Sequence, residues 1–157
     1  MKRTHHCNEL RLEHAGQEVT LSGWVHSRRD LGGVIFIDVR DREGRTQLVF
    51  DPQETDVALV EAAGKLHSES VITVSGKVRQ RPDETENSKI PTGQVEIVAA
   101  AMDVNNHAEV LPFQIDEPET AAKVNEELRL QYRYLDLRRP EIMRNMQLRS
   151  RVATATR

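Results

Sequence analysis

One aromatic residue of this sequence lies where its strand pattern places polar side chains. The run 34–40 alternates, so Ile35, Ile37 and Val39 fall on one face. Phe36 shares the other face with Asp38 and Arg40. Two arginines and an aspartate, at 28–30, lie just upstream. An aromatic ring among charged groups can stack on an unpaired base. The plainer alternative is a phenylalanine half-covered by a loop.

Five strand-like runs and one helix must position this ring. The strands are predicted at 19–25, 34–40, 46–50, 70–81 and 93–101, with turns at 32–33 and 41–44. A helix is predicted over 54–67, and a short capping helix over 8–18 with Asn8 as its N-cap. Three strands, a helix and two strands are the order of an OB-fold, a mainly β five-stranded barrel with a helix between strands 3 and 4.

Period-two alternation gives each predicted strand an inner apolar face and an outer polar face. Arginine can contact phosphate or stack on a base, and glutamine and glutamate can read base edges. Any single polar residue on the predicted outer face is more simply interpreted as a solvated position. The convergence of several such residues on one side of the barrel nevertheless favours RNA binding. The predicted outer face consists of Phe36, Asp38, Arg40, Arg45, Gln47, Lys77, Arg79, Arg81, Gln94 and Glu96.

Charge and composition restrict the partners. The net charge of -3 is untypical of a general nucleic-acid binder. Residues 125–157 hold 8 Lys and Arg against 4 acidic residues, whereas residues 1–124 hold 14 against 21. An RNA partner would therefore be recognised by local contacts and shape. The single Cys7, the lack of a stretch of about 18 apolar residues and the lack of a secretory signal predict a cytoplasmic protein without a membrane anchor.

Several motifs resemble the anticodon-binding part of bacterial-type aspartyl-tRNA synthetases, over essentially the whole chain. Lysyl- and asparaginyl-tRNA synthetases share the barrel and parts of the Tyr-Leu-Asp-Leu segment, but the Arg-Arg-Pro continuation is similar to the aspartate enzyme. The motifs that carry the resemblance are the run 23–44, Gln47 with 50–52, and the segments 76–79, 92–96 and 130–141.

The resemblance implies that the barrel binds the anticodon loop of aspartate tRNA. The residue matching Phe36 stacks on an anticodon base, and those matching Gln47 and Glu96 read base edges. Ser27 departs from the arginine that relatives often carry, which is expected to weaken a phosphate contact. The RNA-binding residues implied in this way are Arg28, Arg29, Asp30, Phe36, Gln47, Arg79, Arg81, Asn87 and Glu96.

We expect three parts: an OB-fold anticodon-binding domain over 1–105, a helical hinge segment over 106–140, and the truncated start of a class II catalytic domain, its motif 1 helix, over 141–157. Motifs 2 and 3 would then lie outside the sequence. The chain alone is therefore expected to be a binding module with no catalytic residues and no cofactor. The parent is expected to be a homodimeric ligase that uses ATP and Mg²⁺ to charge tRNA with aspartate. The histidines lack ligand spacing, so no metal site is expected.

Two other interpretations stay open: a free-standing OB-fold protein that binds RNA or single-stranded DNA, and a regulatory paralogue without a catalytic half. A stripe of apolar residues on the terminal helix argues against a free-standing barrel, because such a stripe needs a partner. The stripe consists of Ile142, Met143, Met146, Leu148 and Val152.

Leu31 and Glu84 bear on which tRNAs the parent accepts. Some relatives charge only aspartate tRNA, whereas others also charge asparagine tRNA, whose anticodon differs at its third position. The tolerant kind tends to carry His where this chain has Leu31 and Gly where it has Glu84. We expect discrimination, because Leu31 donates no hydrogen bond to an alternative base. The alternative is that Leu31 merely begins a turn and Glu84 is a solvated loop residue.

Overall fold

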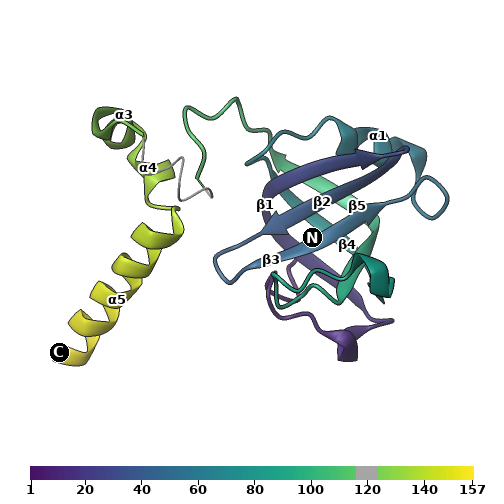
Figure 1. Ribbon diagram of the computed structural model, residues 1–157, viewed down its shortest axis with the longest axis horizontal. Coiled ribbons are helices and arrows are strands. Elements are labelled where there is room, and N and C mark those ends of the chain that lie inside the picture. Colours follow the sequence, from purple (N-terminus) through teal and green to yellow (C-terminus); the bar gives the residue numbers. More distant parts are fainter. Residues whose placement is uncertain (116–123) are drawn as a thin grey trace. The chain divides into compact units, whose positions relative to one another are not determined.

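The structure is a computed structural model that describes residues 1–115 and 124–157. It divides into two compact units, Met1–Val110 and Leu111–Arg157 (Figure 1). No helix in the described ranges is both long enough and apolar enough to cross a membrane.

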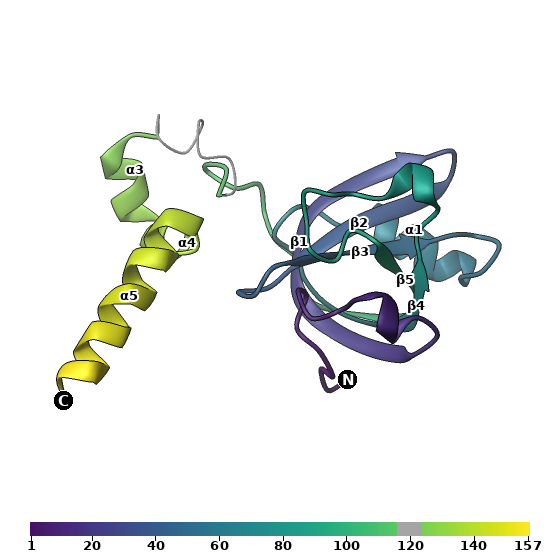
Figure 2. The same ribbon diagram turned by 60° about the horizontal axis from the view of Figure 1, so that its bottom comes forward.

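The first unit is a closed five-stranded barrel in the order β1-β2-β3-β5-β4 (Figure 1, Figure 2). Neighbouring strands are antiparallel except β3 and β5, which are parallel. Helix α1 (Val57–Gly64) lies between β3 and β4 in the chain, so the predicted OB-fold is confirmed. The strands are β1 (Glu18–Leu31), β2 (Val34–Arg40), β3 (Arg45–Phe50), β4 (Val71–Gln80) and β5 (Val95–Asn106).

β1 is the longest strand because it pairs with two neighbours in turn. Residues Glu18 to Trp24 pair with β4, and residues from Trp24 to Leu31 pair with β2, with a bulge between Val25 and Ser27. The sequence predicted an end at Val25, since the polar run 26–31 does not alternate; pairing with β2 keeps that run extended. Gly32 and Gly33 close the hairpin with φ values of +65° and +90°, which suit a two-residue turn.

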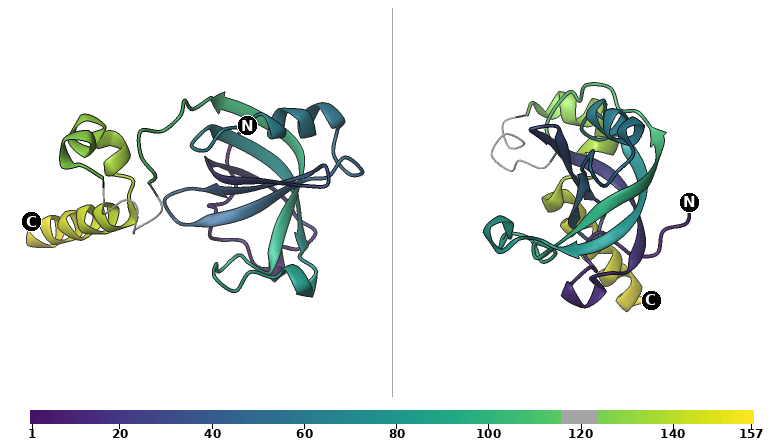
Figure 3. Two further views of the ribbon diagram at one scale, coloured as in Figure 1. Left: turned by 45° about the horizontal axis from the view of Figure 1, so that its top comes forward. Right: turned by 90° about the vertical axis from the view of Figure 1, so that its right-hand side faces the viewer.

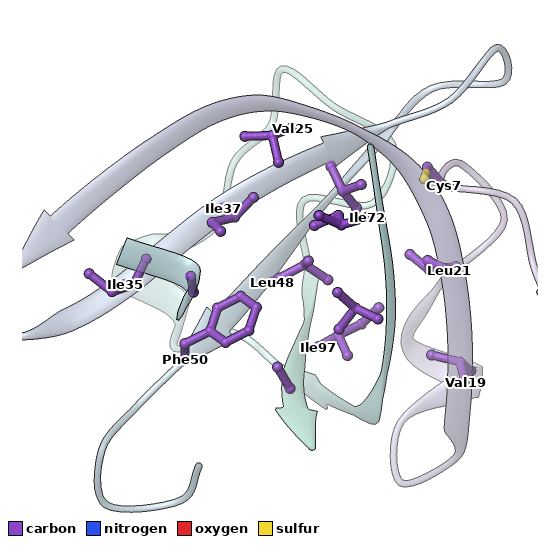
Figure 4. Packing of buried hydrophobic residues seen from close by; sticks show 14 of the residues in the cluster. Cys7, Val19, Leu21, Val25, Ile35, Ile37, Leu48, Phe50, Ile72 and Ile97 are labelled. Carbon is purple, nitrogen blue, oxygen red and sulfur yellow. The ribbon is translucent and has the colours of Figure 1, made fainter. Parts of the chain in front are cut away.

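Apolar side chains from all five strands fill the barrel (Figure 4). Ile37, Leu48, Phe50 and Ile72 are each fully buried, and burying a side chain of this size stabilises the fold by about 1.5–3 kcal/mol. The strands also approach closely at Gly23, where an added Cβ would lie 2.3 Å from the Arg40 carbonyl oxygen. The predicted inner face is confirmed.

The prediction of a capping helix over 8–18 is wrong. Only a short 3-10 turn, η1 (Leu12–His14), forms there, and Asn8 is not its N-cap. The neighbouring side chains of Cys7 and Leu10 are fully buried in the barrel core. Burial of these two residues therefore fixes the path of the segment and overrides its helix propensity.

Helix α1 is shorter than the predicted range 54–67. It begins after Asp56, whose carboxylate accepts a hydrogen bond from the Ala58 N–H at 2.8 Å. Just before it, the Thr55 hydroxyl donates to the Ala99 carbonyl of β5 at 2.9 Å. Because this contact ties the segment to β5, the chain cannot become helical as early as 54.

The loop between β4 and β5 contains the 3-10 turn η2 (Asp83–Thr85) and projects from the barrel (Figure 3). It folds back on itself at Gly93, where an added Cβ would lie 1.8 Å from the Asn87 carbonyl oxygen. Beyond this loop, β5 continues to Asn106 and past the predicted end at 101, because it remains paired with β4.

The second unit contains α3 (Glu126–Gln131), α4 (Arg133–Asp136) and α5 (Pro140–Thr156), which agree with the predicted helical segment. Its small core includes Phe113 and Leu135. Helices of four to six residues do not persist on propensity alone, so other contacts must hold α3 and α4.

A fully buried carboxylate supplies those contacts. Asp136 accepts hydrogen bonds from Arg129 at 2.9 Å, from Arg139 at 3.2 Å and also from Arg133. Burial by itself raises the pKa of Asp136, but the hydrogen bonds and positive charges of these arginines hold it below its usual value. The ionised carboxylate therefore joins α3, α4 and the start of α5.

Candidate nucleic-acid interface

The register of the strands gathers the predicted polar residues on one outer face of the barrel. Arg29 of β1 lies opposite Phe36 of β2, and Asp38 of β2 lies opposite Gln47 of β3. Residues directly opposite each other in an antiparallel pair share a face. Phe36 is half-buried within a strand whose exposure alternates residue by residue, so its ring is on the outer side and partly open to solvent.

The same face continues across β5 and β4. Glu96 of β5 lies opposite Arg79 of β4. Because β3 and β5 pair in parallel with Leu48 opposite Ile97, the residues that precede these two, Gln47 and Glu96, are neighbours. Five strands thus contribute to one surface.

Hydrogen bonds join these side chains into a continuous series, which we call the cross-strand chain: Ser27, Asp38, Arg29, Gln47, Glu96, Arg79 and Glu54. At one end, Ser27 Oγ donates to Asp38 Oδ2 at 3.1 Å. Arg29 Nη2 donates to Asp38 Oδ1 at 3.4 Å and to Gln47 Oε1 at 2.9 Å. The loosest of these contacts is the one between Arg29 and Asp38.

At the other end of the cross-strand chain the contacts are shorter. Gln47 Nε2 donates to Glu96 Oε2 at 2.8 Å, and Arg79 Nε donates to Glu96 Oε1 at 2.8 Å. A second guanidinium nitrogen of Arg79 contacts a residue outside the sheet: Nη1 donates to Glu54 Oε1 at 2.9 Å. Each oxygen of Glu96 therefore accepts one hydrogen bond and keeps one lone pair.

These contacts fix the amide orientation of Gln47. A guanidinium can only donate and an ionised carboxylate can only accept, so Gln47 Oε1 must face Arg29 and Nε2 must face Glu96. One N–H and one oxygen lone pair of the amide remain for a ligand. The side chain is held in a defined orientation before any ligand binds.

Gln47 and Glu96 are more enclosed than their outward position suggests, at 6% and 3% exposure. A buried carboxylate is costly unless it is paired, and Arg79 supplies the pairing charge. Burial by itself lowers the pKa of Arg79, but the hydrogen bond and attraction to Glu96, with a further contribution from Glu54, raise it above its usual value. Arg79 is therefore positively charged beside Glu96 at neutral pH.

Arg81 is also buried, at 4% exposure, although it was predicted on the outer face. Its Nε donates to the Val95 carbonyl at 3.1 Å, and its Nη1 donates to the Thr85 carbonyl of η2 at 3.4 Å. Burial lowers its pKa, but a guanidinium stays protonated. Among the residues that the structure describes, Arg81 Nη2 has no hydrogen-bond partner, so a water or ligand acceptor can satisfy it.

The structure does not bring every predicted residue to this face. Arg28 lies opposite Ile37 and Asp30 opposite Ile35, so both belong to the other face of β1. Asp30 Oδ1 accepts a hydrogen bond from the Gly33 N–H at 3.0 Å, which stabilises the hairpin turn. Of the run 28–30, only Arg29 joins the cross-strand chain.

The remaining predicted site residues lie at the end of β1 and in the loop between β4 and β5. Leu31 is 63% exposed at the end of β1, and it shares a strand face with Arg29, two residues earlier. Glu84 is exposed in η2. In the same loop, Asn87 Oδ1 accepts from the Lys89 N–H at 3.0 Å, so part of its amide stabilises the loop itself.

Sequence reasoning missed two members of the cross-strand chain. Ser27 was interpreted as a lost phosphate contact, whereas its hydroxyl donates to Asp38. Glu54 was placed inside the predicted helix, yet it pairs with Arg79. Asp38, by contrast, was on the predicted outer face, and the period-two pattern located it. No pattern marks Ser27 or Glu54, because each partner is distant in sequence.

Residues 1–115 and 124–157 contain no group of three or more His, Cys, Asp and Glu side chains that could hold a metal ion. The charges of the interface nearly cancel: Arg29, Arg79 and Arg81 face Asp38, Glu54 and Glu96. An interface of this kind attracts a polyanion only weakly at long range, so recognition must come from short-range contacts.

Comparison with known proteins agrees with this geometry. Residues 19–105 match the family described as an OB-fold nucleic acid binding domain, the tRNA anticodon family. Two curated relatives carry the name aspartate--tRNA(Asp/Asn) ligase. The one from Opitutus terrae is 48% identical over 157 residues, which are 100% of this chain and 26% of that protein. The one from Gluconobacter oxydans is 54% identical over 155 residues, which are 99% of this chain and 25% of that protein.

Two solved structures show the same fold. Asparaginyl-tRNA synthetase from Pyrococcus horikoshii, complexed with asparaginyl-adenylate, aligns with 99% of this chain and 33% of its own, at a TM-score of 0.81 and 28% identity. OBody AM2EP06, bound to hen egg-white lysozyme, aligns with 69% of this chain and 97% of its own, at a TM-score of 0.61 and 29% identity. The chain spans about a quarter of the length of the curated relatives it matches.

Proposed function

Because this chain belongs to the tRNA anticodon family of OB-fold nucleic acid binding domains, we propose that the face built on the cross-strand chain reads the anticodon loop of aspartate tRNA. The observation that carries the proposal is the Gln47–Glu96 contact, which Arg29 and Arg79 hold from either side. Groups that are fixed before binding lose little entropy when they bind.

The unused hydrogen-bonding capacity of this pair defines what it can read. An ionised Glu96 only accepts, whereas Gln47 retains one donor and one acceptor. The pair therefore suits a base edge that carries an N–H donor next to a carbonyl acceptor, such as the Watson–Crick edge of uracil or guanine. Phe36 adds a stacking surface on the same face, worth roughly 1–3 kcal/mol per base.

Substitution of the ring tests the platform. Phe36→Ala should weaken binding of an aspartate anticodon stem-loop by about 1–3 kcal/mol, roughly 5- to 150-fold, because stacking is lost. Filter binding at one fixed salt concentration measures the change. Phe36→Tyr, which keeps an aromatic ring, is the control and should bind nearly as the unmodified chain does. Unchanged affinity of Phe36→Ala would refute the platform.

For the parent protein we infer an ATP- and Mg²⁺-dependent ligase that joins aspartate to tRNA in the cytoplasm as a homodimer, with the present chain as its anticodon-reading part. The names of the relatives at about 50% identity support this inference. Leu148 and Val152 are exposed one helical turn apart on α5, and an apolar pair of this kind fits a contact with another part of the parent protein. Arg28, Asp30 and Asn87 are then proposed to contact RNA outside the cross-strand chain.

The two pieces of information on tRNA choice point in opposite directions. The curated relatives are named for both aspartate and asparagine tRNA, which supports a parent that charges both. Leu31 and Glu84 support a parent that discriminates. We propose discrimination on the strength of Leu31, which is exposed on the strand face that carries Arg29 and offers no hydrogen bond to a second base.

A further inference from the structure

We propose that Glu54 is a positioning residue for base discrimination: it holds Arg79 in the orientation that keeps Glu96 and Gln47 aligned. This inference rests on the proposed function of the cross-strand chain. Glu54 lies outside the sheet, in the segment between β3 and α1. It is therefore the one member of the cross-strand chain whose position is not set by strand pairing. Its carboxylate nevertheless lies 2.9 Å from Arg79 Nη1.

The backbone that carries Glu54 is held on both sides. The Glu54 N–H donates to the Asp51 carbonyl at 2.9 Å, and the next N–H, of Thr55, donates to the same carbonyl at 2.7 Å. The buried Thr55 hydroxyl in turn donates to Ala99 of β5. Glu54 is therefore presented from a turn that is anchored to the strand on which Glu96 lies.

Arg79 needs such a partner because it is the only arginine of the cross-strand chain that pairs with the buried Glu96. Its side chain is 37% exposed, so its guanidinium has room to rotate. The hydrogen bond to Glu96 fixes Arg79 Nε, and the hydrogen bond to Glu54 fixes Arg79 Nη1. Together they restrain the plane of the guanidinium. If Arg79 turned away, Glu96 Oε1 would lose its donor, and of the contacts in the cross-strand chain only the one with Gln47 would still hold the Glu96 carboxylate.

A purely electrostatic role for Glu54 makes the opposite prediction. Its side chain is 47% exposed, and a negative charge beside an RNA site repels phosphate. If repulsion were its main effect, removing the charge would strengthen the binding of every RNA equally. If Glu54 positions Arg79, its removal should instead reduce the preference for the correct base.

The experiment compares Glu54→Gln with the unmodified chain, using an aspartate anticodon stem-loop and three stem-loops that each differ at one anticodon base. Glu61→Gln in α1 is the matched control, since it removes the same exposed charge and its side chain is not part of the cross-strand chain. We expect Glu54→Gln to lower the cognate-to-mismatch affinity ratio at one anticodon position by about two- to fivefold, as one part-exposed ion pair allows. Glu61→Gln should leave all ratios unchanged.

The other possible results would contradict either the positioning role of Glu54 or the proposed function. Unchanged ratios for Glu54→Gln, or a uniform rise in affinity for all four stem-loops, would overturn the positioning role while leaving the proposed function intact. An unmodified chain with no preference among the stem-loops would refute the proposed function itself. The melting temperature of Glu54→Gln should equal that of Glu61→Gln, which separates a positioning effect from a loss of fold.

Discussion

Replacing Glu96 by glutamine tests whether the hydrogen-bond donors and acceptors of the cross-strand chain can be arranged in only one way. The carboxylate accepts from Arg79 Nε and from Gln47 Nε2, both at 2.8 Å. An amide at position 96 offers one acceptor and one donor, so in either orientation a donor faces a donor. If the Gln47 amide flips to avoid this contact, its Nε2 faces the Arg29 guanidinium, and two donors again oppose each other.

The magnitude follows from burial. Position 96 is 3% exposed, and a buried donor left without a partner costs about 1–3 kcal/mol. Glu96→Gln should therefore lower the melting temperature of the barrel by roughly 5–15 °C. It should also weaken binding of the cognate stem-loop about 5- to 150-fold and shift preference toward a base that presents an acceptor at that edge.

Circular dichroism melting and filter binding at fixed salt measure both effects, with Glu61→Gln again as the control for loss of one carboxylate. A Glu96→Gln variant with unchanged melting temperature and unchanged base preference would refute the claim that only one arrangement of donors and acceptors is possible. A variant that is destabilised but keeps its base preference would show that Glu96 stabilises the barrel without reading the base.

Three further predictions concern the parent and the second unit. The 157-residue chain alone should neither exchange pyrophosphate in the presence of aspartate and ATP nor charge tRNA; turnover by a clean preparation would contradict the binding-module assignment. In the full-length parent, Leu31→His should narrow the difference in kcat/KM between aspartate and asparagine tRNA, and near-equal values for the unmodified enzyme would overturn the expected discrimination. Asp136→Asn should destabilise the second unit by about 2 kcal/mol or more, because three arginines lose their common partner; hydrogen exchange of α3–α5 should accelerate while the barrel is unaffected. Folding lowers the pKa of Asp136. Its stabilisation is therefore present above the unfolded carboxyl pKa of about 3.9 and is lost as the pH falls through the lower, folded pKa. Hydrogen-exchange protection of the second unit that does not decrease on acidification below the unfolded pKa would contradict this prediction.

Much of the barrel could be predicted from local pattern. Alternation located the inner faces of all five strands, and Gly32–Gly33 marked the hairpin turn, because strand side chains alternate and left-handed φ values favour glycine. The segment after Cys7 could not be predicted in this way. Its helix-like composition is overridden by the burial of Cys7 and Leu10 in a core that is assembled from distant strands.

The sequence by itself indicated the family, through the motifs that resemble it, and the outer positions of Phe36, Gln47 and Glu96 in a barrel, which follow from residue type and a period of two. Only the tertiary structure decided that Gln47 and Glu96 are hydrogen-bonded neighbours, because parallel pairing of β3 with β5 brings together residues 49 positions apart. It also placed Arg28 and Asp30 on the opposite face from Arg29 and added Ser27 and Glu54 to the site. A hydrogen bond depends on distance and direction in space, and strand register and bulges set both through contacts that no local pattern contains.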